Sequence, residues 1–157
     1  MKLAEALAER AAAVRRVEQL RSRIVANARH QEGETPAEDA QRLLADAGMV
    51  LDELETLIRR INRTNSVVAV DDEGTLTDAL ARRDVLRLRH AVITAAADAA
   101  AGKDRPGLGM RQLRSELAML SALPVADLRA QADVLARAVR ELDVRIQRTN
   151  WEADLLD

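Results

Sequence analysis

The chain contains two copies of one helical pattern, and this duplication constrains its fold more than any other feature of the sequence. The run Arg63-Thr64-Asn65 recurs as Arg148-Thr149-Asn150, an offset of 85 positions. A second match, offset by 73 positions, aligns residues 3–10 with residues 76–83. The apolar heptad before the first ending also has its counterparts before the second: Leu43, Ala47, Val50, Leu54, Leu57 and Ile61 correspond to Leu128, Ala132, Leu135, Val139, Leu142 and Ile146. The sequence therefore predicts two copies of one helical hairpin.

Apolar residues at helical spacing predict four long helices joined by short connections, which favour antiparallel neighbours. We expect an all-α fold, an antiparallel four-helix bundle in a single domain 1–157, with one hairpin over 2–65 and the other over 75–151. The run Thr35-Pro36-Ala37-Glu38 has the pattern of a capping box and predicts the start of the second helix.

The connections carry turn and cap residues. Asp71-Asp72-Glu73-Gly74 predicts a turn, Thr75 or Thr77 is expected to cap the third helix, and Gly102 is expected to end it. Residues 102–123 are predicted to be irregular. Within them, residues 117–123 favour either a helical turn or a short strand, and such a strand would pair with residues 67–70 as a two-stranded β element.

Composition excludes several classes of function. Trp151 is the only aromatic residue, so the aromatic platform typical of single-stranded nucleic-acid binding is missing. The formal net charge is −2 and no basic stripe stands out, so we expect no DNA partner. The chain has no cysteine, which excludes disulfides and thiolate metal sites. Phosphate-binding glycine motifs are also missing, and we expect no cofactor.

No apolar run approaches the length that crosses a bilayer, and the chain starts in an amphipathic helix without a signal-peptide pattern. We therefore expect a cytoplasmic protein without stable membrane association.

Four polar side chains fall on the predicted core stripes near one end of the bundle, where they would form a polar layer: Arg10, Asn65, Arg83 and Asn150. One interpretation is structural, with asparagines that end helices and arginines that pair with carboxylates to fix register. The other is a binding site. The candidate carboxylates at similar depth are Asp52, Glu55, Glu141 and Asp143.

The segment Arg83 to His90, with Asp84 directly after the arginine, resembles the R-x(4–6)-H motif of the helical HEPN ribonucleases. The resemblance implies that Arg83 would hold the scissile phosphate and that His90 would transfer protons, without a metal ion. The family pairs two such motifs in a dimer. RNA is expected as a partner only under this alternative.

His30, Glu32 and Glu34 lie within five residues of the first hairpin turn and are candidate ligands for a metal ion. The alternative interpretation of these residues is a solvated turn whose negative charge precedes the dipole of the following helix.

Several segments across nearly the whole chain resemble the septicolysin family of small bacterial proteins. They include residues 2–7, 31–39, 61–65, 75–86 and 146–151. The resemblance implies an all-α protein whose molecular function is uncharacterised. The family's name suggests a haemolysin, but a short, helical chain almost without aromatic residues argues against pore formation.

Our leading hypothesis is a non-enzymatic, self-associating protein with a structural or scaffold role. Two predicted helices carry an apolar face in addition to the core stripe, and extra apolar faces are typical of interfaces. We expect a symmetric homo-oligomer, a dimer or a larger ring. The residues of these faces are Leu44, Leu51 and Ile58 on the second helix and Val85, Leu88 and Val92 on the third.

Overall fold

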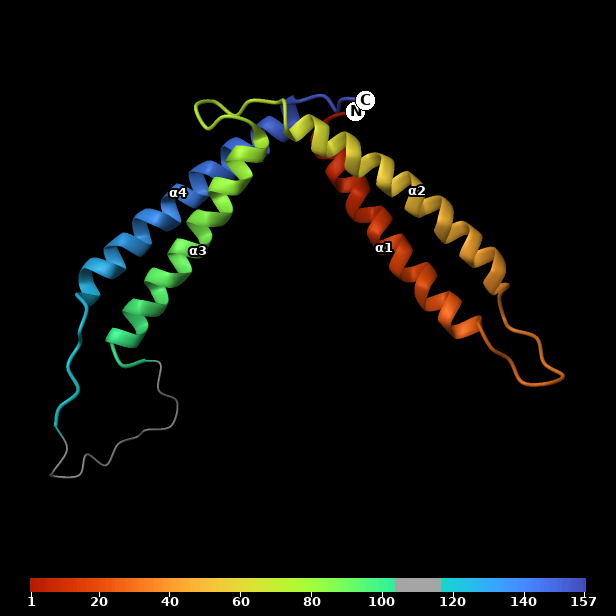
Figure 1. Ribbon diagram of the computed structural model, residues 1–157, viewed down its shortest axis with the longest axis horizontal. Helices are drawn as coiled ribbons and strands as arrows, with labels where there is room; N and C mark the ends of the chain where they lie inside the picture. Colours follow the sequence, from red (N-terminus) through yellow and green to blue (C-terminus); the bar gives the residue numbers. More distant parts are fainter. Residues whose placement is uncertain (104–116) are drawn as a thin grey trace. The chain divides into compact units, whose positions relative to one another are not determined.

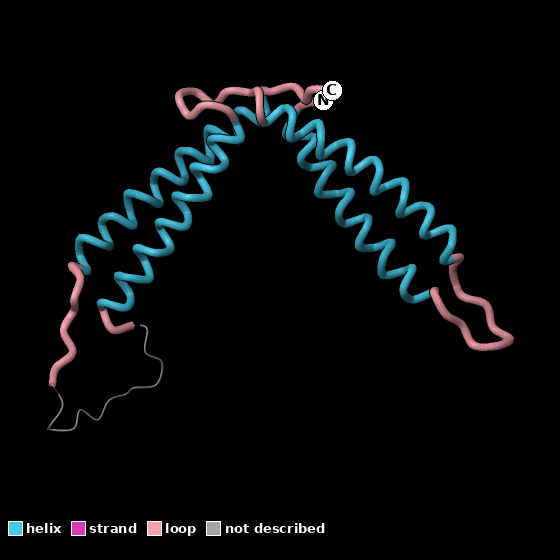
Figure 2. The backbone as a smooth tube through the Cα atoms, in the orientation of Figure 1, coloured by secondary structure: helices cyan, strands magenta, loops and turns pink. Residues whose placement is uncertain are grey.

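The computed structural model describes residues 1–103 and 117–157. It contains four α-helices, drawn in Figures 1 and 2: α1 (Leu3–Asn27), α2 (Ala40–Asn65), α3 (Leu76–Ala100) and α4 (Val125–Glu152). Within the described ranges, β pairing is limited to two isolated bridges. The prediction of an all-α fold is confirmed.

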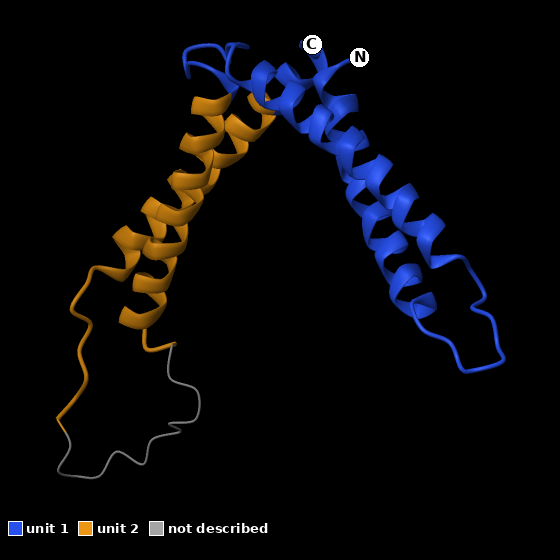
Figure 3. Ribbon diagram, turned by 45° about the vertical axis from the view of Figure 1, so that its right-hand side comes forward, with its two compact units in different colours: residues 1–76, 147–157 blue, residues 77–146 orange. Residues whose placement is uncertain are grey.

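The chain forms two compact units (Figure 3). Unit 1 comprises Met1–Leu76 and Gln147–Asp157, and unit 2 comprises Thr77–Ile146. The predicted hairpins correspond to α1–α2 and α3–α4, except that the end of α4 belongs to unit 1. In the part of the chain that the structure describes, no helix is both long and apolar enough to cross a membrane.

In unit 1, α1 and α2 pack against each other as an antiparallel pair. The predicted stripe of α2 is confirmed at its two ends, where Leu43 and Ile61 are buried. On α1, apolar residues at helical spacing predict a core stripe of Leu3, Leu7, Val14, Val17, Ile24 and Ala28. This prediction was partly wrong: Val14 is exposed, whereas Ala6 and Leu20 are buried. An Ala- and Leu-rich helix offers two neighbouring apolar frames, and packing against α2 selects only one of them.

In unit 2, α3 and α4 lie side by side. Two ion pairs join them: Arg129 Nη2 lies 2.6 Å from Asp98 Oδ1, and Arg87 Nη2 lies 2.7 Å from Asp143 Oδ2. This pairing requires the two helices to run antiparallel. The core consists of small and branched side chains: Ala79, Ala97, Leu128, Ala132, Leu142 and Ile146.

The duplication seen in the sequence is also present in the burial of side chains. Leu3 and its counterpart Leu76 are both fully buried, and Ile61 matches Ile146. The further buried pairs are Ala6 with Ala79 and Leu43 with Leu128. Core positions are therefore apolar in both copies. A position that is apolar in only one copy is not required by the shared core.

The start of α2 differs from the prediction. The helix begins at Ala40, not at the Thr35–Glu38 run, because Asp39 accepts hydrogen bonds from the backbone N–H groups of Gln41 (3.0 Å) and Arg42 (3.3 Å). A carboxylate that accepts two of the otherwise unpaired N–H groups is a strong cap. The capping-box prediction was therefore wrong by one turn.

Glu38 instead attaches the connecting loop to α1. Its carboxylate accepts hydrogen bonds from the Arg23 guanidinium, and its backbone N–H donates to Asn27 Oδ1 at 3.0 Å. The hydrogen bond with Arg23 holds the pKa of the Glu38 carboxyl below its usual value. The same bond raises the pKa of Arg23.

The predicted turn at 71–74 is confirmed. Asp71 and Gly74 adopt left-handed backbone conformations, with φ of 43° and 87°, and the Val70 N–H donates to the Gly74 carbonyl at 2.8 Å. Helix α3 starts at Leu76, so Thr75 takes the first of the two predicted cap positions.

Gly102 ends α3 with φ of 77°. The N–H groups of Gly102 and Lys103 bond to the carbonyls of Ala99 and Asp98, the Schellman pattern that closes many helices.

The predicted pairing of residues 117–123 with residues 67–70 is not found among the described residues. In the described part of the irregular segment, residues 117–123 adopt neither helix nor strand, and residues 104–116 lie outside the described residues. Ala69 instead pairs with Thr75 across the turn. A partner six residues away is reached with far less loss of chain entropy than a distant one.

The second bridge brings the two ends of the described chain together. The Leu3 N–H donates to the Ala153 carbonyl, and the Leu155 N–H donates to the Met1 carbonyl, each at 2.9 Å. We call residues 153–157 the C-terminal segment. This contact was not predicted from the sequence.

This contact repeats the α2–α3 connection. There the Leu76 N–H donates to the Val68 carbonyl and the Val70 N–H donates to the Gly74 carbonyl, each at 2.8 Å. These four residues are the repeat counterparts of Leu3, Ala153, Leu155 and Met1. Val70 is buried, as is its counterpart Leu155. The duplication therefore extends beyond the helices into the segments that join them.

Candidate functional site

The predicted site residue Arg83 is held by two carboxylates. Its Nη2 lies 3.0 Å from Asp84 Oδ1, and its Nη1 lies 3.7 Å from Asp143 Oδ1 on α4. The side chain is only 22% exposed. Asp143 is one of the four carboxylates considered as partners from the sequence. The arrangement suits an arginine that fixes the register of α3 against α4.

His90 lies beside a different arginine. Arg87 and His90 on α3, with Ala136 and Val139 on α4, line a pocket of about 210 Å³. The Arg87 side chain is 51% exposed, and its Nη2 donates to Asp143 Oδ2 at 2.7 Å. His90 is half-buried. The cation that shares a pocket with His90 is therefore Arg87, one turn beyond the predicted Arg83.

The four residues of the predicted polar layer differ in their surroundings. Arg10 is exposed, so it does not belong to the core of unit 1. A long charged side chain on an amphipathic helix reaches solvent at a lower free-energy cost than burial of its charge would require. Asn65 ends α2 as predicted and is half-buried. Asn150 is half-buried too, but α4 continues to Glu152 and does not end at Asn150.

The candidate metal ligands His30, Glu32 and Glu34 are all exposed. In residues 1–103 and 117–157, no three side chains of the metal-binding types lie close enough to hold an ion. His30 Nδ1 instead lies 3.0 Å from the neighbouring Gln31 carbonyl. Residues 31–34 form a turn in which the Glu34 N–H donates to the Gln31 carbonyl at 3.0 Å, which fits the interpretation as a solvated turn.

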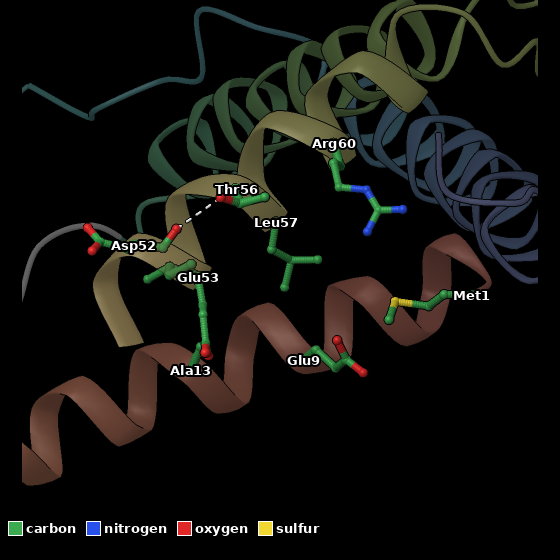
Figure 4. Close-up of a pocket in the computed structure, with 9 residues that line it drawn as sticks. Met1, Glu9, Ala13, Asp52, Glu53, Thr56, Leu57 and Arg60 are labelled. Atoms are coloured by element: carbon green, nitrogen blue, oxygen red, sulfur yellow. Dashed lines mark hydrogen bonds between the residues drawn. The ribbon is translucent and has the colours of Figure 1, made fainter. Parts of the chain in front are cut away.

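Unit 1 contains a larger open groove of about 500 Å³ between α1 and α2 (Figure 4). Leu57 points into it from α2, and carboxylates of Glu9 and Glu53 lie along it. The Thr56 hydroxyl bonds back to the Asp52 carbonyl at 3.1 Å. The groove combines an apolar floor with an acidic rim.

The groove does not bring together the groups that a nucleophilic or acid–base reaction needs. Its polar groups are carboxylates and one threonine, and its arginine, Arg60, binds the C-terminal segment through the Leu156 carbonyl and the Asp157 carboxylate. Two acidic positions of the rim, Glu9 and Asp52, correspond to Arg82 and Arg137 in the second copy. The acidic character is thus specific to the first hairpin.

Sequence reasoning missed Arg87 and Ala136, although the repeat contained the necessary signal. The positions that correspond to Arg87, His90, Ala136 and Val139 in the first hairpin are Val14, Val17, Leu51 and Leu54. Comparison of all aligned positions, and not of His90 alone, would have shown that two valines of the first hairpin are replaced by Arg87 and His90 and one leucine by Ala136.

Comparison with known proteins agrees with this fold and names no activity. A crystal structure of a functionally unknown conserved protein from Corynebacterium diphtheriae is similar over 99% of both chains, with 37% identical residues and a TM-score of 0.87. The curated proteins include no match to this sequence. Residues 10–155 match the model of a family of unknown function, DUF6847. The match covers most of the sequence, and the chain therefore belongs to the DUF6847 family.

Proposed function

We propose that this protein works as a self-associating helical scaffold and that it has no catalytic activity of its own. The observation that carries the proposal is an exposed apolar face on each of two helices, one in each unit. On α3, Leu88 and Val92 are each 67% exposed and Val85 is 55% exposed. On α2, Leu44 and Leu51 are 57% and 48% exposed, and Ile58 is half-buried.

The α3 residues form one stripe on the side away from α4. At 3.6 residues per turn, Val85, Leu88 and Val92 lie opposite the stripe of Arg83 and Arg87, whose side chains bond to α4. These apolar side chains therefore face away from α4 and are largely exposed. Contiguous apolar side chains exposed on one helix face mark a protein interface.

The duplication supports a role beyond folding. Val85, Leu88 and Val92 correspond to Ala12, Arg15 and Gln19 in α1. The α2 residues Leu44, Leu51 and Ile58 likewise correspond to Arg129, Ala136 and Asp143 in α4. Core positions are apolar in both copies, whereas four of these six positions are polar in the other copy and the remaining two carry only alanine there. The hairpin fold does not need them to be apolar.

A second copy of the chain is the partner that this proposal names. Most soluble oligomers are closed and symmetric, and a two-fold dimer is the commonest form. In such a dimer the same apolar stripe of both protomers meets across the two-fold axis, so each apolar residue of the sequence is buried in both subunits.

Light scattering coupled to size-exclusion chromatography tests the proposal. Leu88→Arg places on α3 the residue that the first hairpin has at Arg15, and we expect it to convert the oligomer to a monomer. Val25→Arg is the matched control, because Val25 is 72% exposed on α1, outside both faces. A monomeric wild-type protein, or equal masses for all three proteins, would refute the proposal.

A ribonuclease is the second candidate, and the observation that favours it is the open pocket beside His90. Cleavage of structured or unstructured RNA by the purified protein, lost in His90→Ala, would support it. No cleavage, or equal cleavage by both proteins, would remove it. Arg83 would have to leave Asp84 and Asp143 to hold a phosphate.

The resemblance to the septicolysin family suggests a third activity, haemolysis, with less support. It rests on the sequence resemblance alone. An erythrocyte lysis assay with the purified protein, compared with buffer, tests it directly.

A further inference from the structure

We propose that the groove between α1 and α2 receives the outer face of α3 from a second copy of the chain (Figure 4). The inference rests on the proposed self-association and names the surface that binds the exposed apolar residues of α3. We call Val85, Leu88 and Val92 the α3 stripe. A two-fold dimer can pair this stripe with itself, but the charges on the chain favour a contact between two different surfaces. Contacts of that kind close into rings.

The groove offers an apolar floor bordered by carboxylates. Leu57 points into it from α2, and Ala13 borders it on α1. Three exposed acids line the groove, and none of their side chains forms an ion pair or a hydrogen bond within the described residues. Like charges along one groove repel one another, so a cation at this rim lowers their electrostatic energy. The three acids are Glu9, Asp52 and Glu53.

The outer face of α3 carries the matching pattern of apolar and charged residues. Arg89 follows Val85 by four positions and precedes Val92 by three, so it borders the α3 stripe along one edge. Arg82 lies two helical turns before Arg89, on the same edge. Arg89 is exposed and forms no ion pair in the part of the chain that the structure describes. The face therefore combines an apolar centre with a basic edge.

Each hairpin carries only one of these two surfaces. In the second hairpin, two acids of the groove are replaced by arginines: Glu9 corresponds to Arg82, and Asp52 to Arg137. In the first hairpin, the position of Leu88 in the α3 stripe is taken by Arg15. The duplicated fold thus requires neither surface. One surface on each hairpin is the arrangement that a contact between two different surfaces needs.

The two surfaces also match in length. The groove follows α2 from Asp52 to Arg60, which is about 12 Å at the rise of an α-helix, and the α3 stripe is about 10 Å long. An amphipathic helix that lays its apolar side in a groove is a common mode of protein recognition. The apolar floor would then cover the α3 stripe, and Arg89 would lie at the acidic rim.

Charge reversal with recovery tests this contact by sedimentation equilibrium at low salt. The groove variant, Glu9→Arg with Asp52→Arg, has at these positions the residues of the second hairpin. The α3 variant has Arg82→Glu with Arg89→Glu. We expect each variant to weaken association by about tenfold or more, because like charges then face each other. A chain with all four substitutions keeps the formal net charge of −2, and we expect it to associate as the wild-type protein does.

Arg137→Glu with Arg140→Glu is the matched control for the α3 variant. It changes the net charge by the same amount at two exposed arginines of α4 that belong to neither surface. We expect this control to associate like the wild-type protein. Added salt should narrow the difference between the wild-type protein and the two test variants, because salt screens exposed charges. Circular dichroism establishes that each variant is folded.

The groove contact is overturned if the folded groove variant and the folded α3 variant both associate as the wild-type protein does. It is also overturned if the chain with all four substitutions does not recover the association. Self-association itself stands in both cases, provided that Leu88→Arg dissociates the oligomer. A wild-type protein that remains a single chain refutes self-association and, with it, the groove contact.

Discussion

The backbone N–H of Leu156 donates a hydrogen bond to the hydroxyl of Thr64 at 3.0 Å, across 92 positions of the sequence. The same hydroxyl donates to the Arg60 carbonyl at 2.8 Å, and Thr64 is fully buried. One side chain thus links the last turn of α2 to the C-terminal segment. The bond between Thr64 and Leu156 was not predicted from the sequence.

Thr64→Val should lower the free energy of unfolding by about 0.5–1.5 kcal/mol, because the N–H of Leu156 loses its hydrogen-bond acceptor while the shape of the buried side chain is kept. Urea denaturation measures the difference. Thr56→Val is the matched control: Thr56 makes the same type of bond within α2, to Asp52, but is exposed and has no contact with the C-terminal segment. We expect it to change stability by no more than about 0.5 kcal/mol. Equal losses in the two variants would show that the bond to Leu156 contributes nothing.

Glu38→Gln should reduce stability at neutral pH and have a smaller effect in acid. Arg23 holds the pKa of the folded Glu38 carboxyl below its usual value. A depressed pKa stabilises the fold above the pKa of the unfolded carboxyl, and this contribution is lost as the pH falls through the folded pKa. Urea titrations of both proteins between neutral and acidic pH measure the difference. A difference that stays constant over this range would show that the carboxylate charge is not involved.

Asp71→Val should destabilise the turn by about 1–2 kcal/mol, because Asp71 has φ of 43° and a β-branched residue is strained in that region. Asp71→Gly should not destabilise it. Asp71 is exposed, so the comparison is free of packing effects. Thermal unfolding of the two variants gives the measurement. Equal unfolding midpoints for the valine and glycine variants would contradict the left-handed conformation of residue 71.

The helices could be predicted from the sequence because the same core positions are apolar in both copies of the hairpin. Leu43 and Leu128, or Ile61 and Ile146, are buried in equivalent places, so the same apolar period appears in both copies. The predictions failed where two local solutions compete. Asp39 and Thr35 are both acceptable caps, and in the structure Asp39 caps the helix while Glu38 bonds to Arg23.

The contacts of the C-terminal segment could not be read from local patterns. They join residues about 150 positions apart through backbone groups, which carry no signal in the sequence. The pocket beside His90 was only partly predicted. His90 was found through its spacing from Arg83, whereas Arg87 and Ala136 are recognisable only as departures from the repeat. In a duplicated fold, such departures indicate which residues serve something other than the core.

The central claim is that the chain self-associates through the exposed apolar faces of α2 and α3. Sedimentation equilibrium over a wide range of protein concentration tests this claim most directly. We compare the wild-type protein with a triple variant, Val85→Ala, Leu88→Arg and Val92→Gln, which gives α3 the outer residues of α1. We predict that the wild-type protein sediments as a multiple of its 17.2 kDa chain and the triple variant as a single chain. A wild-type protein that remains a single chain at every concentration would contradict this claim.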